Sequence, residues 1–132
     1  MTTSLTRVYR FSASHRLHAA SLSNAENSAL YGKCNNPFGH GHDYVLEITC
    51  GGGQVRIGAL DRLVNEAVLS NFAYSNINTD VPEFQQLVPT TENIVGVIAD
   101  RLSTVWHRLG GGVNLIRVHV QETARNSFEI TL

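Results

Sequence analysis

The stretch Cys34-Asn-Asn-Pro-Phe-Gly-His-Gly-His-Asp-Tyr-Val-Leu-Glu-Ile-Thr-Cys50 carries most of the information about this chain. It opens with a thiol, two imidazoles and three residues that bend the backbone, and residues 43–50 then read as a strand. His40 and His42 are two positions apart, so a strand that includes them turns both imidazoles to one face. Two imidazoles at this spacing can bind one metal ion. A third ligand from elsewhere would complete a zinc site with the open position that a catalytic zinc needs.

A candidate for the third ligand stands at the end of another strand. Residues 7–17, Arg-Val-Tyr-Arg-Phe-Ser-Ala-Ser-His-Arg-Leu, read as a strand, and His15 ends its apolar face. His40 and His42 begin the apolar face of the second strand. If the two strands pair antiparallel, the end of the first lies beside the start of the second, and the three imidazoles converge. The alternative is that they are ordinary polar residues near strand ends. The His-Gly-His pair with a matching third histidine favours metal.

The composition predicts a single globular domain over residues 1–132. Hydrophobic residues make up 42% of the chain and charged residues 16%, and the net charge is −1. This charge argues against a nucleic-acid partner, and no apolar run approaches the roughly 20 residues of a membrane span. Two cysteines in a chain without a recognisable signal peptide indicate free thiols in a reducing compartment. We therefore expect a cytoplasmic protein.

The remaining periodicities predict two helices and two further strands. Apolar residues fall at helical spacing over about 59–70, and a second helix begins near Thr90-Thr91-Glu92 and ends at the glycines 110–112. Residues 113–122 and 127–132 read as strands. The order is strand, strand, helix, helix, strand, strand. It predicts an α+β domain in which both helices cover one face of a four-stranded antiparallel sheet.

The other face of the predicted sheet is polar. Its side chains are those of Arg10, Ser12, Ser14, Glu47, Thr49, Arg117, His119, Gln121, Glu129 and Thr131. A small sheet with open edges commonly hides them by associating with copies of itself. Residues 19–37, rich in Ser and Asn, are predicted to form a long excursion with room for one helical turn. A loop of this length in a small domain is usually functional.

Five segments resemble the 6-pyruvoyl-tetrahydropterin synthase family, whose relatives include bacterial 6-carboxy-tetrahydropterin synthase. They are Phe11–Leu17, Gly32–Tyr44, Asp80–Phe84, Thr90–Asn93 and Gln121–Thr123. The segments follow one another in the family's order and spacing, so the resemblance extends over nearly the whole chain. The resemblance implies the tunnelling fold, in which subunits join their sheets into a barrel, usually as a hexamer of two trimers. It implies 7,8-dihydroneopterin triphosphate as the substrate and zinc as the cofactor of a reaction that rearranges the side chain and expels triphosphate.

The resemblance also assigns roles to residues. By position, His15, His40 and His42 match the zinc ligands, Cys34 matches the catalytic thiol, and Glu122 matches the carboxylate that anchors the pterin ring. Thr90 and Thr91 match residues that line that pocket.

Each of these roles has a plainer alternative. Cys34 can instead be a small buried thiol, and Glu122, which ends an apolar strand face, can form an ion pair with Arg125. Thr90 and Thr91 can be the cap of the second helix. Arg16 and Lys33 flank the site and are candidates for contact with triphosphate, with a solvated surface role as the alternative.

The chain departs from the family pattern at one place. The family has an Asp-His pair after the first long helix, and here the corresponding positions are Ala73 and Tyr74. Loss of a general base costs on the order of a hundredfold in rate. Three interpretations follow. Tyr74 or His18 replaces the pair, or the chain cleaves the same substrate differently to a 6-carboxy or 6-hydroxymethyl pterin, or it binds pterin and zinc without turnover.

Overall fold

Five strands form one sheet in the computed structural model, which describes residues 2–132. The long strands are β1 (Ser4–His15), β2 (His40–Gly51), β4 (Asn114–Thr123) and β5 (Asn126–Thr131), and β3 (Ser75–Asn76) is short. Their order across the sheet is β3-β1-β2-β4-β5. The pairs β1–β2, β2–β4 and β4–β5 are antiparallel, which confirms the predicted four-stranded arrangement.

The fifth strand was not predicted. β3 is two residues long and pairs parallel with Ala13 and Ser14 at the edge of β1. The backbone N–H of Tyr74, immediately before it, donates to the carbonyl of Ser12 at 2.6 Å. A two-residue strand has no alternation of polarity to detect, so only its tertiary contact with β1 defines it.

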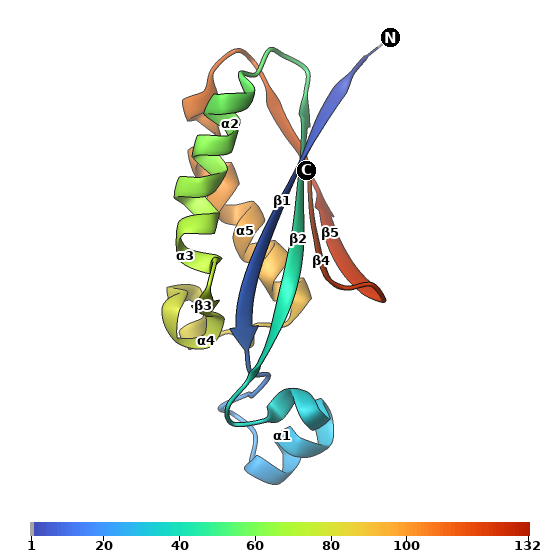
Figure 1. Ribbon diagram of the computed structural model, residues 1–132, viewed down its shortest axis with the longest axis vertical. Coiled ribbons are helices and arrows are strands. Elements are labelled where there is room, and N and C mark those ends of the chain that lie inside the picture. Colours follow the sequence, from blue (N-terminus) through green and yellow to red (C-terminus); the bar gives the residue numbers. More distant parts are fainter. Residues whose placement is uncertain (1) are drawn as a thin grey trace.

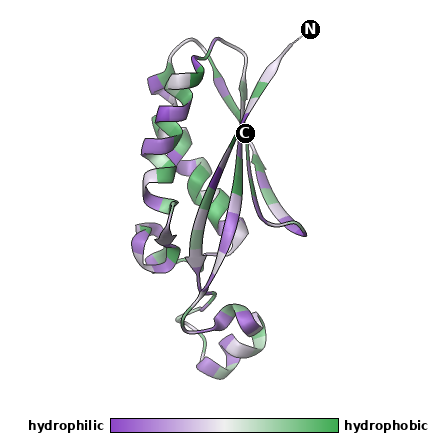
Figure 2. Cartoon of the chain, in the orientation of Figure 1, coloured by the Kyte–Doolittle hydropathy of each residue, from purple (hydrophilic) through white to green (hydrophobic). Residues whose placement is uncertain are grey.

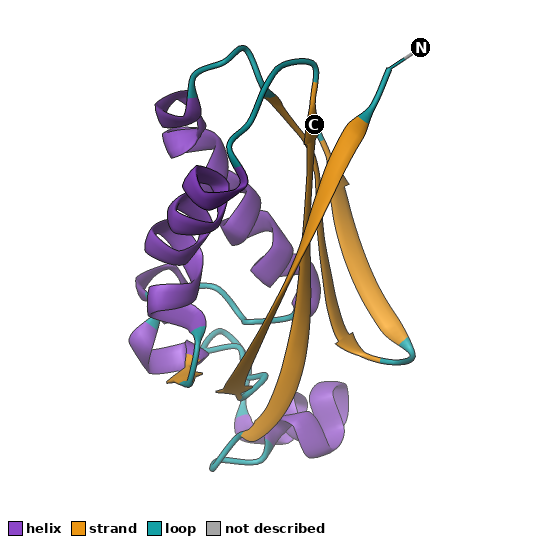
Figure 3. Cartoon of the chain, turned by 45° about the horizontal axis from the view of Figure 1, so that its top comes forward, coloured by secondary structure: helices purple, strands orange, loops and turns teal. Residues whose placement is uncertain are grey.

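The helices of residues 57–109 gather on one side of the sheet, as Figures 1 and 3 show. The first predicted helix consists of α2 (Ile57–Val64), a π-helical turn (Asn65–Leu69) and α3 (Ser70–Phe72). The second is α5 (Thr91–Val105), followed by a 3-10 turn (Trp106–Leu109). Between them lie α4 (Ile77–Asp80) and a 3-10 turn (Pro82–Gln85).

The core lies between these helices and the sheet. Its fully buried side chains include Tyr44, Leu46, Ile48, Leu60, Val64, Phe72, Ile94, Ile98, Leu102 and Val118. Figure 2, coloured by hydropathy, shows hydrophobic residues alternating with hydrophilic ones along the strands and helices. The apolar stripes predicted from periodicity are therefore the surfaces that pack together.

Arg101 fastens α5 to the segment that precedes it. Its guanidinium donates to both carboxylate oxygens of Glu83 at 2.6 Å and lies over the ring of Phe72, 5.3 Å from the centroid. It also donates to the carbonyl of Ala67 at 3.2 Å, within the π-helical turn, and to the side chain of Asn71 at 2.8 Å. One side chain thus holds three elements against α5.

Residues 19–37, predicted as a long loop with room for one helical turn, contain a full helix. α1 (Asn24–Tyr31) begins at a capping box, in which Ser23 and Glu26 exchange side-chain and backbone hydrogen bonds, and a 3-10 turn (Gly32–Asn35) follows it. Asn27 is fully buried and bonds the backbone of Ala19 and Ser23. Figure 1 shows α1 beyond the ends of β1 and β2, away from the other helices.

The opposite sheet face is polar, as predicted. Arg117 pairs with Glu47 at 3.2 Å and with Glu129 at 3.3 Å, and Thr6 bonds Thr49 at 2.8 Å. No helix in the described part of the chain has the length and apolar character needed to cross a membrane.

Candidate metal centre

Three histidines converge where β1 ends and β2 begins. His15 lies directly opposite His40 in the antiparallel register, and His42 lies opposite Ala13, as the strand pairing predicted. The ring centroids are 4.9 Å apart for His15 and His40, 5.1 Å for His15 and His42, and 4.7 Å for His40 and His42. One ring nitrogen from each lies within 4.8 Å of the others, so the three could hold one metal ion.

The backbone carbonyl of Pro89 orients the ring of His15. Its Nδ1 lies 2.8 Å from the carbonyl oxygen of Pro89, and because a carbonyl only accepts, Nδ1 carries the proton. Nε2 of His15 is then an unprotonated acceptor. It is buried without a hydrogen-bond partner among the described residues, and so is Nε2 of His42. A buried lone pair without a partner is costly, and a metal ion would satisfy both.

Electrostatics favour the neutral imidazoles that a metal requires. Burial lowers the pKa of His15, and this effect outweighs the raising effects of the hydrogen bond to Pro89 and of the Glu122 charge; His40 and His42 lower it further. Burial also lowers the pKa of His40, with additional lowering from His42 and Lys33. Both rings are therefore poised to donate a lone pair near neutral pH.

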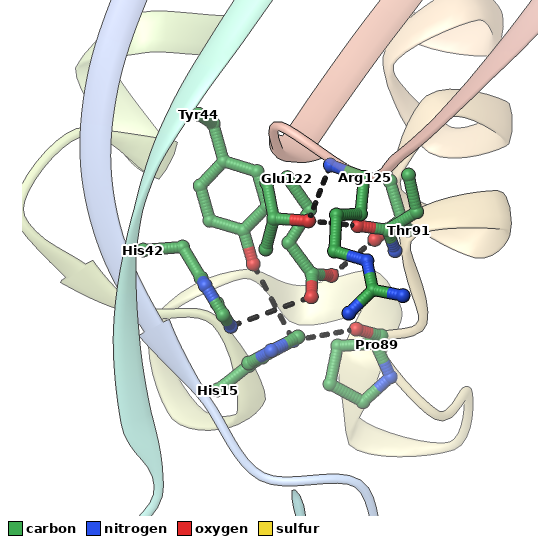
Figure 4. A network of polar contacts seen from close by, with 9 residues as sticks. His15, His42, Tyr44, Pro89, Thr91, Glu122 and Arg125 are labelled. Atoms are coloured by element: carbon green, nitrogen blue, oxygen red, sulfur yellow. Dashed lines mark hydrogen bonds and ion pairs between the residues drawn. The ribbon is translucent and has the colours of Figure 1, made fainter.

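A carboxylate faces the histidines from β4. Oε1 of Glu122 lies 3.4 Å from Nε2 of His42, and its Oε2 accepts a short hydrogen bond from the hydroxyl of Thr91 at the start of α5 (Figure 4). The alternative pairing with Arg125 is not found. Arg125 is exposed after β4, and it makes no ion pair with Glu122 in the part of the chain that the structure describes.

The two threonines predicted to line the pocket differ in their contacts. Thr91 is 4% exposed and points to Glu122. Thr90 is the N-cap of α5, and its hydroxyl accepts from the backbone N–H of Asn93 at 3.2 Å. The cap role is thus observed for Thr90, and its predicted contact with a ligand stays a prediction.

Cys34 lies in the 3-10 turn after α1, half-buried and free. Its carbonyl accepts from the backbone N–H of Leu17 at 2.8 Å, which ties this turn to the segment just after His15. It does not belong to the group of side chains that could share a metal. Its predicted role as the catalytic thiol stays a prediction.

Tyr74, at the departure from the family pattern, and His18 do not belong to the group of side chains that could share a metal. Tyr74 is 92% exposed and has a φ of 58°, which is unusual for a bulky residue. It borders a hollow whose lining also includes Ser12, Asp43 and His42. His18, the other candidate replacement, is held by Asn35, whose amide donates to its Nδ1 at 2.9 Å.

Sequence reasoning missed the residues that support the site. They include Pro89, whose carbonyl orients His15, and Tyr44, whose hydroxyl lies 3.4 Å from Nδ1 of His15. Tyr44 lies on the same strand face as His40 and His42, so the alternation along β2 could have identified it as a neighbour of the histidines. No signal identified Pro89, because its contact spans 74 residues.

Comparisons with known proteins agree with this geometry. The model of the family described as 6-pyruvoyl tetrahydropterin synthase matches residues 4–131. The human 6-pyruvoyl tetrahydrobiopterin synthase is 42% identical over 129 residues, which cover 92% of this chain and 86% of the human one. The Drosophila melanogaster protein of the same name is 38% identical over 129 residues, covering 92% of this chain and 75% of that protein.

A solved structure shares the fold closely. The 6-pyruvoyl tetrahydropterin synthase of Caenorhabditis elegans superposes with a TM-score of 0.88 at 31% identity, covering 99% of this chain and 96% of that one. An uncharacterized protein from Wolinella succinogenes has a TM-score of 0.70 at 14% identity, over 99% of this chain and 98% of that one, which shows the fold alone.

Proposed function

Because the chain belongs to the 6-pyruvoyl tetrahydropterin synthase family, we propose that it is a zinc-dependent lyase acting on the side chain of 7,8-dihydroneopterin triphosphate. One observation carries the proposal. The Nε2 atoms of His15 and His42 are buried and have no hydrogen-bond partner among the described residues, and the Glu122 carboxylate, which suits a pterin ring, lies 3.4 Å from Nε2 of His42. A site built for packing alone would leave no such lone pairs.

His15, His40 and His42 would hold the zinc ion. Three imidazoles with an open fourth position match a catalytic rather than a structural site. When bound, zinc polarises the oxygens of a hydroxylated side chain and acidifies the adjacent C–H. Chelation of the metal should stop turnover and leave the far-UV circular dichroism unchanged, because the apolar core packs without it. Unfolding on chelation would indicate a structural zinc instead.

Glu122 would anchor the pterin. The aminopyrimidine edge of a pterin presents adjacent N–H donors, which fit the two oxygens of one carboxylate. Thr91 donates to Oε2 of Glu122 and thereby fixes the carboxylate relative to α5. The ring held by Glu122 would place the substrate side chain toward the histidines, since Glu122 lies 3.4 Å from His42.

Cys34 would accept the proton from the acidified C–H of the side chain. The experiment follows release of inorganic triphosphate from 7,8-dihydroneopterin triphosphate by ion chromatography, in wild type and Cys34→Ala. We expect the variant to lose release while it keeps zinc and binds pterin. Full turnover by Cys34→Ala would refute the thiol role. Cys50→Ala is the matched control, because Cys50 is fully buried at the end of β2.

A second candidate function rests on Ala73 and Tyr74. The absence of an Asp-His pair favours a paralogue that makes a 6-carboxy or 6-hydroxymethyl pterin, or a homologue that binds pterin without turnover. Retention of unchanged substrate by the zinc-loaded protein would support the binding homologue.

The assembly is a homohexamer of two trimers in this proposal, with sheets joined at their open edges into a barrel. The exposed outer strand β5 supports it. Sedimentation equilibrium would test it, with a hexamer mass expected and a monomer mass contradicting it. The two free thiols support placement in the reducing cytoplasm.

A further inference from the structure

The hydroxyl of Tyr44 is a buried donor without an acceptor. Tyr44 is fully buried on β2, and its hydroxyl oxygen lies 3.4 Å from Nδ1 of His15. That nitrogen directs its proton to the carbonyl of Pro89, 2.8 Å away, so the hydroxyl oxygen can only accept from it. The proton of the hydroxyl itself has no acceptor among residues 2–132. An unpaired buried donor destabilises a fold, which indicates that its acceptor comes from a bound ligand.

Tyr44 lies between the two halves of the site. It follows His42 by two residues on the same strand face, and the two ring centroids are 5.7 Å apart. The register of β2 and β4 pairs Val45 with Gln121, so its next step places Tyr44 opposite Glu122. Figure 4 shows the hydroxyl turned toward the space between the histidines and the carboxylate. A ligand that contacts both Glu122 and a metal on the histidines therefore passes this hydroxyl.

The hydroxyl keeps its proton and its position. Burial raises the pKa of Tyr44, and the negative charge of Glu122 raises that pKa further. The ring stacks on Phe11, with centroids 5.1 Å apart and planes at 14°. The side chains of His42 and Glu122 are 16% and 14% exposed, so a ligand enters beside them and meets Tyr44 as the inner wall. A neutral O–H donor on a fixed ring is matched to an acceptor atom of that ligand.

A dihydropterin ring carries an acceptor at the corresponding place. Along one edge of the ring, the N–H donors assigned to Glu122 are followed by the carbonyl at C4, then by N5, and then by C6 with the side chain. N5 has a lone pair and shares a double bond with C6. When a proton leaves the side-chain carbon next to C6, the negative charge delocalises onto N5. A hydrogen-bond donor aimed at N5 stabilises that charge.

We propose that the hydroxyl of Tyr44 donates a hydrogen bond to N5 of the bound pterin. This inference rests on the proposed function, because it adds a contact to the substrate of that reaction. The ring would then be held at its N–H edge by Glu122 and at N5 by Tyr44, which turns C6 and its side chain toward the histidines. Tyr44 is thus a catalytic residue that strengthens its hydrogen bond as charge develops on N5.

The test is a double-mutant cycle across this contact, measured by calorimetric titration of zinc-loaded protein. The two probes are 7,8-dihydroneopterin and its 5-deaza analogue, in which C–H replaces N5. Wild type should bind the analogue roughly tenfold more weakly than dihydroneopterin. Tyr44→Phe should bind dihydroneopterin roughly tenfold more weakly than wild type does, and should bind both probes equally. Tyr9→Phe is the matched control and should behave as wild type, because the Tyr9 hydroxyl already donates to Asp61 at 2.7 Å.

A denaturant titration separates this role from a structural one. Tyr44→Phe removes a buried donor that has no acceptor, so the ligand-free variant should unfold at the same denaturant concentration as wild type or at a higher one. Its zinc content should be unchanged, because the carbonyl of Pro89 still holds Nδ1 of His15. A lower midpoint together with unchanged affinity would refute the proposal and show that the hydroxyl bonds within the protein or to a buried water.

The titrations distinguish failure of this contact from failure of the proposed function. If Tyr44→Phe keeps the preference of wild type for dihydroneopterin over the analogue, the donor at N5 is another group. If the variant does not fold, wild type alone decides, and equal affinity for the two probes refutes the contact while the proposed function stands. Failure of wild type to bind dihydroneopterin at all would refute the proposed function, and with it the acceptor assigned to Tyr44.

Discussion

Replacement of Glu122 by Gln should abolish most of the affinity for the pterin ring. The substitution keeps the size of the side chain, and it turns one of two acceptor oxygens into a donor. A pterin edge that offers adjacent N–H groups would then face an N–H group in place of a carboxylate oxygen. Thr91 can still bond the remaining amide oxygen, so the backbone around α5 and β4 should not move.

The magnitude follows from the burial of this pair. The side chain of Glu122 is 14% exposed and Thr91 is 4% exposed, so water screens the interaction little. Loss of one charge-assisted hydrogen bond costs about 1.5–3 kcal/mol, and a buried donor left without an acceptor adds about 1–3 kcal/mol. The sum is about 2.5–6 kcal/mol, which corresponds to a dissociation constant raised roughly two to four orders of magnitude.

The assay is calorimetric titration of zinc-loaded wild type and Glu122→Gln with 7,8-dihydroneopterin, which lacks the phosphates. Glu129→Gln is the matched control, because Glu129 is on the polar sheet face and its side chain is 49% exposed. Zinc content should be equal in all three proteins, since Glu122 is not a predicted ligand. Affinity of Glu122→Gln within twofold of wild type would refute the assignment of the ring to this carboxylate.

Three further results are expected. Thr90→Ala should lower the free energy of unfolding by about 1 kcal/mol in a denaturant titration, because it removes the N-cap of α5; no loss would mean that the cap contributes nothing. Hydrogen bonding by Arg101 lowers the pKa of Glu83, so this carboxylate stabilises the fold at neutral pH, and its contribution is lost as the pH falls through that lowered pKa. The difference in free energy of unfolding between wild type and Glu83→Gln should therefore be smaller in acid than at pH 7. The same difference at pH 7 and at a pH below the ordinary glutamate pKa of about 4.3 would contradict the pairing. The double substitution Ala73→Asp and Tyr74→His should raise formation of the pyruvoyl product, measured by chromatography, if only the proton relay is missing; lower or equal formation would count against that interpretation.

The convergence of the three histidines was predictable because it depends on local alternation. His15 ends one apolar strand face, and His40 and His42 begin another, so antiparallel pairing alone places them together. Glu122 was predictable for the same reason, since it ends the buried face of β4. The positions of all four follow from strand parity, without knowledge of the helices.

The surroundings of the site were not predictable in this way. The carbonyl of Pro89 reaches His15 across 74 residues, and the side chain of Asn78 clamps Arg16 across 62 residues. Neither contact leaves a periodic signal, because each depends on how separate segments pack. β3 was missed for the same reason, and α1 was underestimated because its capping box lies in a stretch rich in turn-forming residues.

The most direct test of the account is the mass of the pterin formed when zinc-loaded protein is incubated with 7,8-dihydroneopterin triphosphate. We expect a product that has lost triphosphate, and the mass of its side chain identifies a pyruvoyl, carboxy or hydroxymethyl pterin. Unchanged substrate, with binding confirmed by calorimetric titration, would contradict the lyase and leave a protein that binds pterin without turnover.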